Sequence, residues 1–174
     1  MKKLMLVLCM AVLLFACNQE APKTEAVATT PTVVDSTKGT VDFAGPEIDL
    51  MKKLVSAIVK ADFATAQSCY ADSAMVWYNT WPGDTTQKGI TVQQDMANAK
   101  ELMETTWGNF SFGEPIYEVV TTASGDKYGH LWARVTGMNK KTKKPFDVPM
   151  FASFLIKDGK LQWEWNLHDS KQLE

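Results

Sequence analysis

Four long segments with the composition of β-strands fill the second half of the sequence and constrain its fold more than any other feature. They span residues 110–121, 127–138, 146–157 and 161–168. Gly125 and Gly159 lie in the first and third connections, and a lysine-rich run over residues 140–144 forms the second. Short polar connections of this kind favour hairpins, so the four segments predict an antiparallel meander.

The residues before the meander predict helices. Pro46 and Glu47 open a helix whose apolar residues recur at helical spacing through Val59. A shorter helix capped by Asp62, a strand over residues 74–79 and a third helix from Thr91 follow. Helices followed by a meander indicate an α+β domain. When the helices pack on the concave face of a curved antiparallel sheet, the result is a cone-shaped barrel with an internal cavity, which is a common ligand site.

The first residues have the layout of a secretion signal. Lys2 and Lys3 precede an uncharged apolar run from residue 4 to residue 15, which is too short to cross a bilayer as a helix. The run ends in Leu14-Phe15-Ala16-Cys17, which resembles a bacterial lipobox. We therefore expect residues 1–16 to be a lipoprotein signal peptide and Cys17 to carry the lipid. The alternative is an ordinary signal peptide that ends near a cysteine.

Residues 17–43 are rich in Thr, Ala, Val, Pro and Lys, and they contain no aromatic residue before Phe43. This composition predicts a lipid-anchored, disordered linker that leads to a folded domain over residues 44–174. The expected location is the bacterial cell envelope, as an outer-membrane lipoprotein that faces the periplasm or the cell surface.

Composition excludes several classes of function. The formal net charge is -2, and Arg134 is the only arginine, so the chain has no electrostatic footprint for nucleic acid. Cys69 is the only cysteine outside the leader and the lipid site, so no intramolecular disulfide is predicted. The two histidines, His130 and His168, form no cluster with ligand spacing, and we expect neither a metal nor another cofactor.

Several phrases between residues 47 and 169 occur in a consistent order and spacing. They are Ala61-Asp62-Phe63, the run over residues 70–77, Gly89-Ile90, the run over residues 144–149, Asp158-Gly159-Lys160 and Trp165. Together they resemble the NTF2-like superfamily, which includes SnoaL-like polyketide cyclases and ketosteroid isomerases. The resemblance implies the NTF2-like cone-shaped fold, but the group contains enzymes, binding modules and scaffolds, so it implies no single function.

The resemblance also implies where an active site would lie, and this sequence departs from that pattern. The aspartate base of the isomerases falls at Tyr78, and their tyrosine donor falls at Leu54. The strand that carries their carboxylic acid has no Asp or Glu over residues 149–156. The Glu-His-Trp-Asp phrase of the cyclases reads Trp163-Glu164-Trp165-Asn166. Steroid-isomerase chemistry is therefore not expected, and the missing carboxyl groups favour a non-catalytic module.

Strand alternation places Gln162, Glu164, Asn166 and His168 on one face of the last strand, which by the resemblance lines the cavity. Leu161, Trp163 and Trp165 then face the opposite side. The predicted ligand-binding set adds residues from the helices, the first strand and the loop after it, and comprises Leu54, Ile58, Tyr78, Trp81, Met96, Glu164, Asn166 and His168.

Two functions remain in view. The first is a membrane-anchored module that binds a small, mostly apolar ligand in the cavity without catalysis. The second is a SnoaL-like enzyme, an isomerase, cyclase or hydratase, that uses Glu164 with Tyr78 or His168. Glu164 is its candidate catalytic base, because burial among aromatic residues raises the pKa of a carboxyl group.

The outer face of the predicted sheet carries a third set of residues. Trp132, Arg134, Trp163 and Trp165 lie on that face by alternation. Trp and Arg are enriched at protein interfaces, so we expect a homodimer through this face. An interaction protein whose cavity is merely filled core is the remaining alternative.

Overall fold

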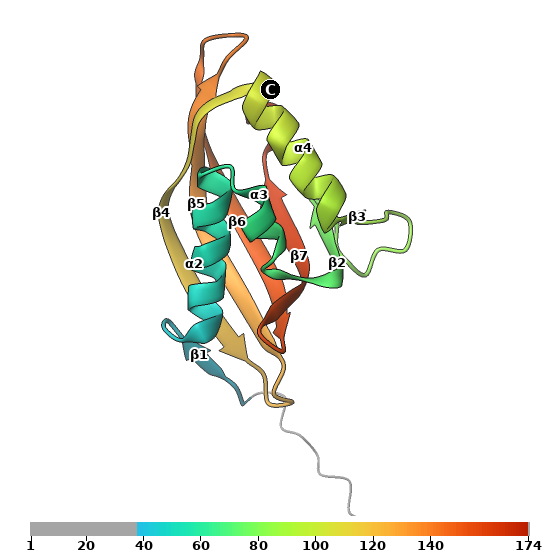
Figure 1. Ribbon diagram of the computed structural model, residues 1–174. Helices are drawn as coiled ribbons and strands as arrows, with labels where there is room; N and C mark the ends of the chain where they lie inside the picture. Colours follow the sequence, from blue (N-terminus) through green and yellow to red (C-terminus); the bar gives the residue numbers. More distant parts are fainter. Residues whose placement is uncertain (1–37, 174) are drawn as a thin grey trace, which may run out of the picture. The chain divides into compact units, whose positions relative to one another are not determined.

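In the computed structural model, which describes residues 38–173, seven strands form one curved sheet (Figure 1). Their order across the sheet is β1–β4–β5–β6–β7–β2–β3. The strands are β1 (Thr40–Asp42), β2 (Tyr70–Tyr78), β3 (Ile90–Thr91), β4 (Trp107–Thr121), β5 (Lys127–Asn139), β6 (Pro145–Lys157) and β7 (Lys160–His168). The helices are α2 (Pro46–Val59), α3 (Phe63–Gln67), α4 (Val92–Thr105) and the 3-10 helix η1 (Ser170–Gln172).

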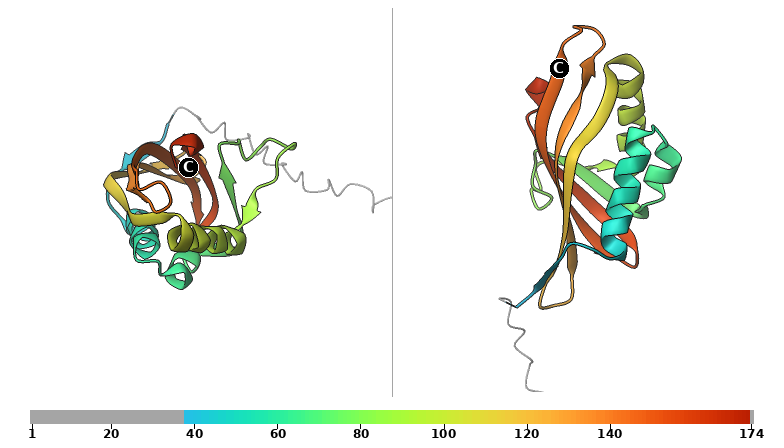
Figure 2. Two further views of the ribbon diagram at one scale, coloured as in Figure 1. Left: turned by 90° about the horizontal axis from the view of Figure 1, so that it is seen from above. Right: turned by 90° about the vertical axis from the view of Figure 1, so that its left-hand side faces the viewer.

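The predicted meander is confirmed. Strands β4, β5, β6 and β7 pair with their neighbours in chain order, and every pair is antiparallel. The sheet as a whole is mixed rather than antiparallel, because β2 lies beside β7 in parallel. Figure 2 shows that the sheet curls without closing and that α2, α3 and α4 lie together along one side of it. The fold class is therefore α+β, with a curved, unclosed mixed sheet.

Helix α2 packs on the concave side of the sheet. Its buried residues recur at helical spacing and comprise Ile48, Met51, Leu54 and Ala57. Gly129 on β5 allows the helix to approach closely, because an added Cβ there would lie 2.6 Å from Sδ of Met51. The helix therefore packs directly on the sheet at this level.

The predicted starts of the second and third helices are confirmed. The Asp62 carboxylate accepts a hydrogen bond from the backbone N–H of Thr65 at 3.0 Å and caps α3. Thr91 and Gln94 form a reciprocal capping box at the start of α4. This capping box fixes the direction in which α4 leaves β3, and hence the face that it turns toward the sheet.

The amino-terminal boundary differs from the prediction. Residues Thr40–Asp42 were expected within the disordered linker, but they form β1 and pair with β4, with Thr40 opposite Thr121. Backbone hydrogen bonds to an open sheet edge outweigh the local composition here. The predicted signal peptide, Cys17 and most of the linker lie outside the described residues. Over residues 38–173, no helix is long and apolar enough to cross a membrane.

Candidate functional site

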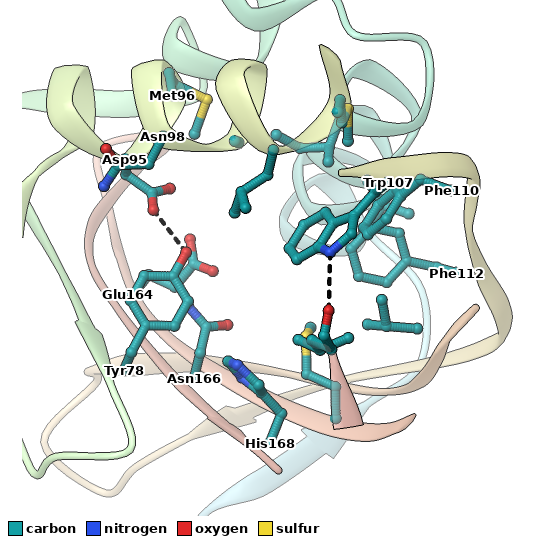
Figure 3. Close-up of a pocket in the computed structure, with 18 of the residues that line it drawn as sticks. Tyr78, Asp95, Met96, Asn98, Trp107, Phe110, Phe112, Glu164, Asn166 and His168 are labelled. Atoms are coloured by element: carbon teal, nitrogen blue, oxygen red, sulfur yellow. Dashed lines mark hydrogen bonds between the residues drawn. The ribbon is translucent and has the colours of Figure 1, made fainter. Parts of the chain in front are cut away.

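A cavity of about 480 Å³ lies between the helices and the concave face of the sheet (Figure 3). Its walls are mostly apolar. Leu54, Val55 and Ile58 come from α2, and Met96, Ala99, Leu102 and Met103 come from α4. Leu131, Val135, Val148, Met150 and Phe154 form the sheet side. The interior of this domain is therefore open to a small molecule rather than filled by side chains.

The structure brings most of the predicted site residues to this one cavity. The residues that line it are Leu54, Ile58, Tyr78, Met96, Glu164, Asn166 and His168. Trp81 was expected at the cavity mouth, but it does not line the cavity. Its side chain is 60% exposed, and its ring packs edge-on against Trp165, with ring centroids 4.8 Å apart. The loop after β2 places Trp81 on the outer side because Trp165 offers an aromatic surface there.

Strand β7 carries the polar side of the cavity. Glu164, Asn166 and His168 share the inner face, as alternation predicts. Leu161 was expected on the opposite face, but it is fully buried in the core. Leu155 pairs with Trp163 while the next residue, Ile156, pairs with Leu161, so β7 bulges by one residue at this point. The bulge reverses the alternation, and Gln162 was therefore also misplaced.

Two tyrosine–carboxyl pairs form the polar end of the cavity. The Tyr70 hydroxyl donates to Oε2 of Glu164, and the Tyr78 hydroxyl donates to Oδ1 of Asp95 at 2.6 Å. Figure 3 shows Asp95, Tyr78 and Glu164 side by side, with Asp95 reaching in from α4. Only 7% of Asp95 and 9% of Glu164 are exposed.

Asp95 and Tyr70 were missed by the sequence analysis. A signal for Asp95 was present, because it follows Val92 by three residues and precedes Met96, and both of these lie on the buried face of α4. The hydrogen bond between Asp95 and Tyr78 joins α4 to β2, and no local sequence pattern predicts such a contact. The cavity therefore holds a second carboxyl group that was not among the predicted site residues.

Burial dominates the electrostatics of these groups. It raises the pKa of Glu164 from 4.5 to about 7, and the neighbouring charge of Asp95 acts in the same direction. The hydrogen bond from Tyr70 and the nearby side chain of Asn166 oppose this rise in the Glu164 pKa. Burial also raises the pKa of Asp95, while the Tyr78 hydrogen bond lowers it. The Glu164 carboxyl is thus poised to gain or lose a proton near neutral pH.

Two further polar groups line the same end. Burial lowers the pKa of His168, whose ring meets the ring of Tyr78 edge-on at 5.8 Å. Its Nδ1 is buried and has no hydrogen-bond partner among residues 38–173. Asn166 is 2% exposed, and its Nδ2 completes no hydrogen bond in the described part of the chain, although it lies close enough to Glu164 to lower that pKa. A ligand can satisfy both nitrogens.

Aromatic residues form the opposite end. Trp107 stacks on Phe110 with ring centroids 5.4 Å apart, and Phe112 meets Phe110 edge-on. The indole N–H of Trp107 donates to the Leu173 carbonyl at 3.3 Å, so the carboxyl-terminal segment lies across this end of the cavity (Figure 3). The sequence analysis did not assign Trp107, Phe110 or Phe112 to the site.

The domain is similar in structure to several solved proteins. An NTF2-like protein from Burkholderia xenovorans matches with a TM-score of 0.56 at 14% identity, over 76% of this chain and 96% of that one. Proteins described as polyketide cyclases match similarly. The one from Xanthomonas campestris gives a TM-score of 0.58 at 12% identity, over 74% and 97% of the two chains. The SnoaL-like one from Shewanella denitrificans gives 0.53 at 13%, over 75% and 95%.

The domain has the NTF2-like fold. The resemblance of the sequence phrases to NTF2-like proteins is therefore confirmed at the level of the fold. No family model and no curated protein matches the sequence. The comparisons therefore show the fold of this domain and not its chemistry.

The residues of this NTF2-like cavity suit some chemistry and not other kinds. Its walls can take an apolar body, and its polar end can donate and accept hydrogen bonds or move a proton at Glu164. Within residues 38–173, no group of three or more His, Cys, Asp or Glu side chains is placed to hold a metal ion. Cys69 is a free, buried thiol that lies outside the cavity lining.

Proposed function

We propose that this NTF2-like domain binds a small, mostly apolar molecule that carries one or two hydrogen-bonding groups. The observation that carries the proposal is the cavity of about 480 Å³, which has apolar walls and a single polar end. Cavities of this size and lining are typical of small-molecule sites. The unpartnered nitrogens of Asn166 and His168 support it, because buried polar groups without partners are costly in an unliganded protein.

Filling the cavity tests this proposal. Ala99 lines the cavity from α4, whereas Ala97 is exposed on the same helix. The full-length chain, with Cys17 replaced by Ser so that no detergent is needed, is titrated against the neutral fluorophore Nile red. We expect Ala99→Trp to abolish binding and Ala97→Trp to leave it unchanged. Equal binding by both variants would show that the dye sits elsewhere, and the proposal would fail.

A second candidate is an enzyme that abstracts a proton next to a carbonyl group. The observation in its favour is Glu164, a buried carboxyl group with a pKa of about 7 at the wall of the cavity. The partners expected for it were Tyr78 or His168, but its hydrogen-bonding phenol is Tyr70. Nonan-2-one in D₂O supplies a direct test, because an enzyme of this kind exchanges the α-protons of the ketone. Exchange that is lost in Glu164→Gln supports the enzyme, and an uncatalysed rate in the native protein excludes this reaction.

We propose that the chain is held at the membrane by a lipid on Cys17. The support is the sequence pattern of a charged start, a short apolar run and a terminal cysteine. Cys17→Ser should move the protein from the membrane fraction to the soluble fraction, as followed by immunoblot. Cys9→Ser, in the apolar run, should leave it in the membrane fraction. Retention of Cys17→Ser in the membrane fraction would refute the anchor.

We also propose that two copies of the domain pair through the outer face of the sheet. Ile116, Trp132, Phe151 and Leu167 lie opposite one another on successive strands and so share that face. Ile116 is 60% exposed and Trp132 is 50% exposed. An apolar row of this kind, exposed on three of its four strands, is typical of an interface.

Sedimentation at micromolar concentration tests the pairing. We expect the native chain to sediment with twice the monomer mass and Trp132→Glu to sediment as a monomer. Thr142→Glu, at the exposed tip of the β5–β6 connection, serves as the control and should stay dimeric. A native chain that sediments as a monomer would exclude the homodimer.

A further inference from the structure

The cavity is lined by acidic groups that have no basic group in the described part of the chain to balance their charge. The titratable groups that line it are Tyr70 and Tyr78 on β2, Asp95 on α4, and Glu164 and His168 on β7. No lysine or arginine among residues 38–173 lines the cavity. Burial lowers the pKa of His168 and keeps its ring neutral near pH 7, so it supplies no positive charge. Two buried acidic groups therefore share one cavity without a cation from the described residues.

Each carboxyl group is only half engaged by the protein. Tyr78 is the single hydrogen-bond partner of Asp95 among residues 38–173, and it uses Oδ1. Tyr70 uses Oε2 of Glu164. Because both phenols donate, each carboxyl is held as an acceptor. Oδ2 of Asp95 and Oε1 of Glu164 are left to accept from another donor at the cavity wall.

Asn166 adds a second, independent observation. Its side chain is 98% buried and lines the cavity, yet its Nδ2 completes no hydrogen bond in the described structure. An amide N–H beside Glu164 stabilises the ionised form of that carboxyl group. Three polar donors, from Tyr70, Tyr78 and Asn166, thus favour charged carboxylates, whereas burial without a cation opposes them.

We propose that the ligand is an apolar amine, whose ammonium group lies between Asp95 and Glu164 while its carbon skeleton fills the rest of the cavity. This inference rests on the proposed binding function. The ammonium supplies the missing positive charge and donates to the two free carboxylate oxygens, while an acceptor atom elsewhere on the ligand takes the hydrogen bond from Asn166 Nδ2. The apolar walls from α2, α4 and the sheet cover the hydrocarbon. A carboxylate ligand of the same length would meet two like charges and no compensating group.

Binding should release protons. An ammonium beside Glu164 and Asp95 favours their ionised forms, so each carboxyl group that is protonated in the free protein gives up its proton when the amine enters. Calorimetry in buffers of different ionisation enthalpy counts these protons. The titratable groups that face the ammonium are those of Asp95, Glu164, His168 and the two phenols. A neutral ligand would release none.

A matched series tests the proposal on the full-length Cys17→Ser chain. Nonylamine, nonan-1-ol and nonanoate share one hydrocarbon chain and differ in charge. We expect nonylamine to displace Nile red at a concentration at least tenfold lower than nonan-1-ol does, and nonanoate to be the weakest. Asp95→Asn and Glu164→Gln should each bring nonylamine to within threefold of nonan-1-ol.

The outcomes separate the two proposals. If Nile red binds but nonan-1-ol or nonanoate displaces it as well as nonylamine does, the amine is refuted and the apolar binding site stands. If Nile red itself fails to bind, the binding function is refuted. Near-ultraviolet circular dichroism shows whether Asp95→Asn and Glu164→Gln fold. If one of them does not, the other variant and the number of protons released by the native chain still test whether the ligand is an amine.

Discussion

Removing the charge of Glu164 should make the domain more stable at alkaline pH. The folded-state pKa of Glu164 is about 7, compared with 4.5 for an ordinary glutamate. Between these two values the folded chain keeps the proton and the unfolded chain loses it. The unfolded state therefore binds fewer protons, and the free energy of unfolding falls as pH rises through this window. The stabilisation is fully present below pH 4.5 and is lost above about pH 7.

The magnitude follows from the same values. At 1.36 kcal/mol per pH unit, the loss between pH 5 and pH 8 is about 2 to 3 kcal/mol. Glutamine does not ionise, and its carbonyl oxygen can still accept from Tyr70. Glu164→Gln should therefore gain about 2 to 3 kcal/mol relative to the native chain between pH 5 and pH 8.

Urea denaturation followed by tryptophan fluorescence measures this difference. The free energies of unfolding of the native chain and Glu164→Gln are compared at pH 5, 6, 7 and 8. Glu101→Gln, at an exposed position on α4, is the control and should run parallel to the native chain. Parallel curves for Glu164→Gln and the native chain would refute the buried-carboxyl reasoning.

Three further substitutions test the packing around the site. Asp62→Ala removes the cap of α3 and should lower the free energy of unfolding by about 1 kcal/mol in urea denaturation. Gly129→Ala drives a methyl group against Met51 and should destabilise the domain by about 1 to 3 kcal/mol, whereas no change would mean that α2 does not pack this closely. Trp107→Phe removes the N–H that donates to the Leu173 carbonyl and should raise the amide hydrogen-exchange rate of the carboxyl-terminal segment. An unchanged exchange rate would mean that this hydrogen bond does not hold the segment.

The frame of the fold was predictable because its signals are local. Glycine-containing turns mark the ends of the strands in the meander, and capping residues such as Asp62 and Thr91 mark the helix starts. The parallel pairing of β2 with β7 was not predictable in this way. It joins segments far apart in the chain, and nothing in either strand alone specifies the direction of its partner.

The site was predictable where strand alternation holds and not where tertiary contacts decide. Glu164, Asn166 and His168 lie beyond the bulge on β7, so alternation places them correctly. Leu161 lies on the other side of the bulge, and its face is reversed. Asp95 enters the site only because α4 crosses β2 near Tyr78, which no local pattern encodes.

The methionine methyl groups give the most direct test that the cavity binds a ligand. Met96, Met103 and Met150 line it, whereas Met75 and Met138 do not. In a methyl-labelled sample titrated with nonan-1-ol, which is independent of the amine proposal, we expect the resonances of the three lining methionines to shift together. Those of Met75 and Met138 should stay in place. No shift at millimolar nonan-1-ol, or shifts at Met75 and Met138 alone, would contradict the internal binding site.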